Sequence, residues 1–354
     1  MQQWPEPVIH VQSLSESGDR AIPERFIKPP SERVTAHQGP EKTMSIPIID
    51  IGGIANGNKF DEETMRALSN ACKEWGFFQL VNHGMNKEII EKAKEVWREF
   101  FHLPMIEKQA FANSPVTYEG YGSRVGVEKN ASLDWSDYFF LNIFPKNLRN
   151  YEKWPSFPNS LRETTKNYTK EVVKLCMMLM EMLSLGLGLD KEYFREAFGG
   201  DEYGACLRAC FYPKCPQPEL TLGLSSHSDP GGLTVLLSDD HVTGLQVRKD
   251  GEWVTVKPVP GALIINIGDQ IQVMSNDIYK SAEHRVQVNS EKERLSIALF
   301  FNPKGDIPIG PAKQLLSAHK PALFQHNITF NEYRQFIRKR GPTGKYQLES
   351  LKTM

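Results

Sequence analysis

The spacing of apolar residues along the chain changes near Gly204. Before it, apolar positions recur at helical intervals and predict helices over residues 62–75, 87–101 and 160–187. After it, short apolar runs alternate with glycine, proline and polar residues, and they predict strands at residues 233–237, 245–247, 253–256, 262–267, 272–274, 284–288 and 295–301. Many short strands separated by turns favour an α+β chain with a mainly β core, a jelly roll flanked by helices.

The ends of the chain carry weaker patterns. Residues 8–14 predict a short helix, and four prolines, the last at Pro40, predict an extended connector that ends near Ser45. Strands are expected over residues 46–51, 76–82 and 135–141, a loop over 118–122, a helix over 329–340 and a polar tail after Gly344. We therefore divide the chain into residues 1–45, 46–200, 201–310 and 311–354, with the second region sharing the core of the third.

Composition excludes several functions. Forty-two Lys and Arg against 43 Asp and Glu give no electrostatic reason to expect nucleic acid or a membrane surface as partner. The five cysteines lack metal-site spacing and are expected to be free thiols. The N-terminus lacks a signal-peptide pattern, and no apolar run has the length of a membrane span. We expect a cytoplasmic monomer, with nuclear access by diffusion as a further option.

Three residues in the strand-rich part form a candidate metal site. In a strand, alternate side chains share a face, so His227 and Asp229 can reach one ion, and His284 can return to the same place. Two histidines and one carboxylate suit mononuclear iron(II), although they also suit catalytic zinc. The simpler interpretation of Asp229 is a turn residue, because Pro-Gly-Gly follows it. His83, in an Asn-His-Gly turn, is expected to be structural.

Arg294 and Ser296 favour iron together with an oxo-acid. Spaced by two on a predicted strand, their guanidinium and hydroxyl can grip one carboxylate. A site with three protein ligands leaves room at the metal for a bidentate co-substrate and O2.

Several motifs in order along the chain resemble plant 2-oxoglutarate/iron(II)-dependent dioxygenases. They are Trp75-Gly76-Phe77-Phe78, Val81-Asn82-His83-Gly84, Tyr212-Pro213-Lys214-Cys215-Pro216, His227-Ser228-Asp229, His284 and Arg294-Leu295-Ser296. The resemblance implies a double-stranded β-helix in which His227, Asp229 and His284 hold iron(II). It also implies that Tyr212, Arg294 and Ser296 bind 2-oxoglutarate, that ascorbate helps turnover, and that the iron centre needs no separate acid or base residue.

One position departs from the family pattern. The family usually has Asn two residues before this tyrosine, where the chain has Cys210. A thiol is a weak donor, so loss of the amide could cost about 1 kcal/mol in co-substrate binding. The other residues of the pattern are present, and we still expect activity.

Further motifs resemble the jasmonate-induced oxygenase branch, which hydroxylates jasmonic acid. They are Trp4-Pro5-Glu6-Pro7, residues 11–17, 117–124, 132–138 and 204–208, and Tyr333-Arg334 with Phe336-Ile337-Arg338. The branch holds the substrate carboxylate with arginines that map to Arg208, Arg334 and Arg338. Its pocket aromatics map to Phe140, Phe300 and Phe330.

The residues alone leave alternatives open. Arg334 and Arg338 share a helix face and can converge on one anion, but a solvated basic face explains them as well. The aromatics could simply be core residues. Two other functions are considered: a dioxygenase of flavonoid (anthocyanidin-synthase-like) or other specialised metabolism, and a non-enzymatic jelly-roll binding protein.

Overall fold

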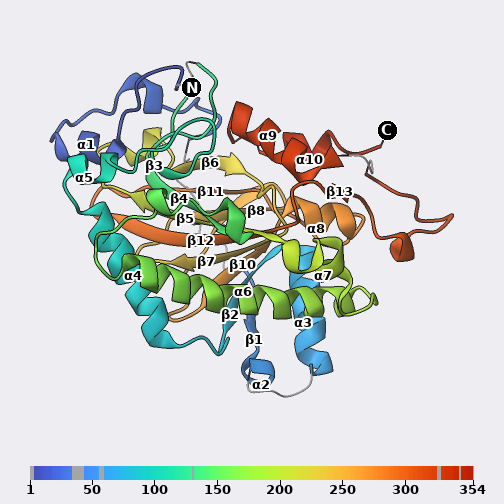
Figure 1. Ribbon diagram of the computed structural model, residues 1–354. Helices are drawn as coiled ribbons and strands as arrows, with labels where there is room; N and C mark the ends of the chain where they lie inside the picture. Colours follow the sequence, from blue (N-terminus) through green and yellow to red (C-terminus); the bar gives the residue numbers. More distant parts are fainter. Residues whose placement is uncertain are drawn as a thin grey trace.

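The computed structural model describes residues 4–33, 44–55, 60–129, 131–324, 328–342 and 344–353. Residues 34–43 of the expected proline-rich connector, Pro40 included, lie outside these ranges. Figure 1 shows a central pair of sheets, with helices α4 and α6 below them and both ends of the chain above.

An eight-stranded sheet forms the larger layer, and both halves of the chain contribute strands to it. In spatial order its strands are β1 (Ile48–Asp50), β2 (Phe77–Val81), β10 (Leu263–Ile267), β7 (Leu233–Ser238), β12 (Arg294–Asn302), β5 (Gly204–Tyr212), β4 (Asp137–Phe144) and β3 (Gly120–Gly122). Apart from the parallel pair β1–β2, neighbouring strands are antiparallel.

The smaller layer has four antiparallel strands, in the order β6 (Leu224–His227), β11 (His284–Val286), β8 (Leu245–Lys249) and β9 (Glu252–Thr255). A separate two-stranded ribbon joins β13 (Pro308–Ile309) to β14 (Ile328–Thr329). The two larger sheets confirm the predicted jelly roll.

Some of the helices begin at side-chain caps. Asp61 accepts a hydrogen bond at the start of α3, Asn86 at the start of α4, and Thr329 forms a capping box with Glu332 at the start of α9. The helices are α1 (Val11–Glu16), α2 (Gly52–Ala55), α3 (Glu62–Glu74), α4 (Lys87–Phe101), α5 (Met105–Gln109), α6 (Leu161–Gly186), α7 (Tyr193–Ala197), α8 (Asp269–Met274), α9 (Phe330–Arg340) and α10 (Tyr346–Glu349). Across the described segments, none has both the length and the apolar character that crossing a bilayer requires.

Alternation along β12 separates the core from the site. Leu295, Ile297, Leu299 and Phe301 belong to the main hydrophobic core with residues of α4 and α6. The intervening positions, from Arg294 to Phe300, line a pocket on the opposite face. Because side chains alternate along a strand, one sheet both anchors the helices and builds the pocket wall.

Three local predictions were wrong. Residues 272–274 lie in helix α8 instead of a strand; all six residues of α8 are buried, so no amphipathic pattern shows its period. Residues 120–122 of the expected loop form the edge strand β3, paired with β4. The tail after Gly344 is not simply polar, because α10 forms there and Leu348 is buried in the main core.

Candidate metal centre and ligand pocket

Strand pairing brings the predicted metal ligands together. The register of β6 and β11 places His227 opposite His284, with ring centroids 4.2 Å apart. Asp229 follows two residues after the end of β6. One ligand atom from each of the three side chains lies within 4.8 Å of the other two. The three residues therefore converge on one point at the pocket wall.

Hydrogen bonds orient each of these side chains. Nδ1 of His227 lies 2.8 Å from the Ser225 carbonyl, and Nδ1 of His284 lies 3.2 Å from the Ala282 carbonyl. A carbonyl only accepts, so each Nδ1 carries the proton and each Nε2 keeps a lone pair. The two Nε2 atoms lie 3.6 and 3.7 Å from Oδ1 of Asp229.

The second oxygen of Asp229 is held by neighbouring strands. Oδ2 accepts hydrogen bonds from Oγ1 of Thr234 at 2.6 Å and from Nδ2 of Asn266 at 2.8 Å. Oδ1 is therefore the oxygen that remains for a metal ion. Such outer hydrogen bonds fix the orientation of a ligand before the ion arrives.

The electrostatics of the three residues suit a divalent cation. Burial, together with the neighbouring His227, lowers the pKa of His284 to about 4, so this imidazole is neutral near pH 7. Burial opposes ionisation of Asp229, but the two imidazoles and Asn266 hold the pKa of its carboxyl well below the usual range. Burial also opposes protonation of His227, yet contact with Asp229 raises the pKa of that imidazole. A metal ion binds the neutral imidazole through its Nε2 lone pair, so metal binding would oppose protonation of His227.

A buried arginine marks the other end of the site. Arg294 on β12 stands opposite Tyr212 on β5, and its guanidinium lies 5.2 Å from the centre of that ring. Nη2 donates to Oγ of Ser238 at 2.8 Å. Nε and Nη1 have no hydrogen-bond partner among the described residues, although the side chain is buried. Unpaired N–H groups on a buried guanidinium favour an incoming carboxylate that can accept hydrogen bonds from them.

Cys210 and Ser296 lie side by side next to this arginine. They are paired in the register of β5 and β12, and Tyr138 on β4 pairs with Cys210 on its other side. All three line the pocket. The thiol that replaces the family's asparagine therefore faces the expected co-substrate position.

The three predicted substrate arginines line the same pocket as the metal residues. Arg208 lies on β5 with its guanidinium 4.1 Å from the centre of the Tyr138 ring, and its Nε lacks a partner within the described chain. Arg334 and Arg338 reach the pocket from α9. Burial and the charge of Arg334 lower the pKa of Arg338 to about 10. An anion placed between these two residues would remove that repulsion.

The predicted aromatic residues also line the pocket, together with an aromatic residue that was not predicted from the sequence. Phe140, Phe300 and Phe330 are all part of its wall. Tyr118 was not predicted; it lines the pocket and donates a 2.7 Å hydrogen bond to the Arg338 carbonyl. It lies within one of the motifs that carry the resemblance, so a signal was present, but its distance from α9 in sequence hid the contact.

A second unpredicted feature joins α9 to the segment Ser228–Asp229, which carries a candidate metal ligand. Oδ2 of Asp269 accepts hydrogen bonds from the Tyr333 hydroxyl at 2.7 Å and from the Ser228 hydroxyl at 3.2 Å. The Asp269 amide also donates to the Asp229 carbonyl. Burial raises the pKa of this carboxyl to about 6. One residue at the start of α8 thus connects the arginine-bearing helix to a metal ligand.

His83, which was expected to be structural, makes two contacts with the backbone. Its Nδ1 accepts from the Met85 amide at 3.2 Å, and its Nε2 lies 3.1 Å from the Gly261 carbonyl. These contacts fix a neutral imidazole with its proton on Nε2.

Comparisons with known proteins agree with this geometry. Residues 203–303 match the 2OG-Fe(II) oxygenase superfamily, and residues 46–157 match the N-terminal family described as non-haem dioxygenase in morphine synthesis. Jasmonate-induced oxygenase 2 of Arabidopsis thaliana is 56% identical over 99% of this chain and 94% of its own length. An oxoglutarate-dependent flavonoid 7-O-demethylase of Ocimum basilicum is 39% identical over 98% of this chain and 91% of its own length.

A solved structure agrees over the whole chain. The crystal structure of JOX2 in complex with 2OG, Fe and JA superposes with a TM-score of 0.93, covers 100% of both chains and is 56% identical. This similarity argues against the two alternatives of a zinc site and a non-enzymatic binding protein. The chain belongs to the 2OG-Fe(II) oxygenase superfamily, and it is an oxygenase that uses iron(II) and 2-oxoglutarate.

Proposed function

We propose that this oxygenase hydroxylates jasmonic acid and so attenuates a defence hormone. The observation that carries the proposal is the set of arginines Arg208, Arg334 and Arg338, which line the same pocket as the candidate iron ligands. A neutral substrate would leave their half-buried charges unpaired, whereas a small carboxylic acid would pair with them. The similarity to jasmonate-induced oxygenase 2, and to JOX2 in complex with JA, supports this choice of acid.

In this proposal, His227, Asp229 and His284 hold the iron, and Arg294, Ser296 and Tyr212 bind 2-oxoglutarate. Bound iron(II) and 2-oxoglutarate would supply activation of O2: one oxygen atom goes to succinate as 2-oxoglutarate loses CO2, and the other converts a C–H bond of the substrate to an alcohol. Arg294 anchors the far carboxylate of 2-oxoglutarate through the N–H groups that lack other partners.

The remaining pocket residues select and orient the substrate. Arg208 lies over the ring of Tyr138 in the pocket that the metal residues line, while Arg334 and Arg338 approach from α9. Holding the substrate carboxylate at these arginines decides which carbon of the substrate faces the iron. Phe140, Phe300 and Phe330 contribute apolar surface for the rest of the molecule.

The test is incubation of the purified protein with iron(II), ascorbate, 2-oxoglutarate and a panel that contains jasmonic acid, other small carboxylic acids and neutral flavonoids. We expect hydroxylated jasmonic acid by mass spectrometry, with succinate released in equal amount. A flavonoid product without a jasmonate product would favour the second candidate, a dioxygenase of flavonoid metabolism, since a flavonoid demethylase is also a relative.

A further inference from the structure

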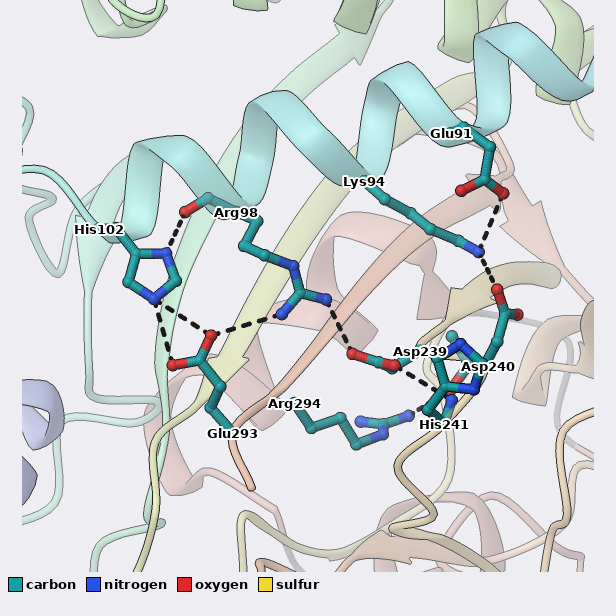
Figure 2. A network of polar contacts seen from close by, with 10 residues as sticks. Glu91, Lys94, Arg98, His102, Asp239, Asp240, His241, Glu293 and Arg294 are labelled. Carbon is teal, nitrogen blue, oxygen red and sulfur yellow. Dashed lines mark hydrogen bonds and ion pairs between the residues drawn. The ribbon is translucent and has the colours of Figure 1, made fainter. Parts of the chain in front are cut away.

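A network of charged residues lies behind the proposed 2-oxoglutarate site, on the helix side of the large sheet. Figure 2 shows Arg98 on α4 between the carboxylates of Asp239 and Glu293. Its Nη2 lies 2.9 Å from Asp239, and its Nη1 lies 3.4 Å from Glu293. His102, one turn further on, also contacts Glu293 at 3.1 Å. Arg98 is thus the cation shared by two acidic residues.

Both acidic residues are chain neighbours of the proposed carboxylate clamp. Glu293 precedes Arg294, and Asp239 follows Ser238, whose hydroxyl accepts from Arg294. Adjacent residues in extended chain point to opposite sides, so the acids face α4 while Arg294 faces the pocket and donates to the Ser238 hydroxyl. Both arginines nevertheless affect the carboxyl of Asp239. Burial opposes its ionisation, but Arg98, and more weakly Arg294, hold its pKa below the usual value.

We propose that Arg98 is a positioning residue for 2-oxoglutarate, because it holds Asp239 and Glu293 on the helix side and leaves the Arg294 guanidinium free. The inference rests on the proposed role of Arg294. Without Arg98, two carboxylates would lose their shared cation close to a buried arginine with two unpaired N–H groups. Asp239, which is mostly buried, would then compete with the co-substrate carboxylate for Arg294.

The experiment measures binding of 2-oxoglutarate to Mn(II)-loaded protein by isothermal titration calorimetry, so it needs no turnover. Arg98→Met should weaken 2-oxoglutarate binding about fivefold. Lys94→Met is the matched control. Lys94 lies one turn earlier on α4 and pairs with Glu91 and Asp240, which are not adjacent to Ser238 or Arg294. This control should stay within about twofold of the unmodified protein.

A second substitution separates charge competition from loss of structure. In the Arg98→Met background, Asp239→Asn removes the competing carboxylate, so the double variant should bind 2-oxoglutarate within about twofold of the unmodified protein. A merely structural role predicts no recovery, because the double variant lacks still more of the network. Failure of this rescue, or equal weakening in Lys94→Met, would overturn the proposal.

Arg294→Leu separates the proposed role of Arg98 from the proposed role of Arg294. If Arg294→Leu weakens binding and Arg98→Met does not, the role of Arg98 is wrong while the clamp assignment stands. If Arg294→Leu binds 2-oxoglutarate normally, the clamp assignment itself is wrong, and the inference about Arg98 falls with it.

Discussion

At the scale of single residues, the metal site depends on three donor atoms whose hydrogen bonds already fix their directions. Replacing His227, Asp229 or His284 by alanine leaves two donors, which hold a divalent ion weakly. We expect each variant to lose stoichiometric iron(II) binding and turnover. Asp229→Glu should also lose turnover, because an added methylene displaces a carboxylate that Thr234 and Asn266 hold in place. Metal analysis of anaerobically loaded protein checks this; any alanine variant with full metal content and activity would contradict the assignment.

His83 gives a pH prediction for stability. Burial lowers the pKa of its imidazole below 6.5, although the Gly261 contact opposes this. The folded state therefore favours the neutral ring. The stability that this residue contributes is present above pH 6.5 and is lost as the pH falls from 6.5 through the lower folded-state value. Between pH 6.5 and pH 5, the free energy of unfolding should fall more steeply in the unmodified protein than in His83→Gln. Parallel curves from denaturant titrations would show that His83 is not responsible.

At the scale of elements, periodicity explains what could be predicted. Strong helical spacing located α4 and α6 to within a residue or two, and the short apolar runs located β7, β10 and β12. The helix α8 could not be found this way, because a helix buried on every side has no polar face. Alternation along β5 also placed Arg208 on the face of Tyr212. The contact between Tyr333 of α9 and Asp269 left no pattern in the sequence, since the two residues lie 64 positions apart.

That contact makes α9 a part of the site and supports another prediction. Tyr333→Phe removes the 2.7 Å hydrogen bond to Asp269, which should cost about 1.5–3 kcal/mol of stability because the partner is a buried carboxylate. The same change should loosen α9 and so raise the KM for jasmonic acid, while the KM for 2-oxoglutarate stays close to its original value. An equal rise in both constants would mean that Asp269 and Tyr333 stabilise the whole fold without a specific effect on the arginine helix.

At the scale of the whole molecule, the pocket is assembled from segments far apart in the chain. Phe140 comes from the N-terminal region, Arg208 from the central strands, and Arg334 and Arg338 from α9. No local pattern shows that α9 approaches the pocket, and a basic helix face is more often solvated. The resemblance to jasmonate-induced oxygenases, and not periodicity, predicted this set, and the structure brings the residues to one pocket.

The measurement that tests the central claim most directly compares jasmonic acid with its methyl ester. The two differ mainly in the charge that the arginines are proposed to recognise. For the unmodified protein, kcat/KM for the acid should exceed that for the ester at least about tenfold, which corresponds to about 1.4 kcal/mol. In the Arg334→Met/Arg338→Met double variant the difference should shrink sharply, while 2-oxoglutarate binding is retained. Equal kcat/KM for acid and ester in the unmodified protein would contradict recognition of the substrate carboxylate by Arg208, Arg334 and Arg338.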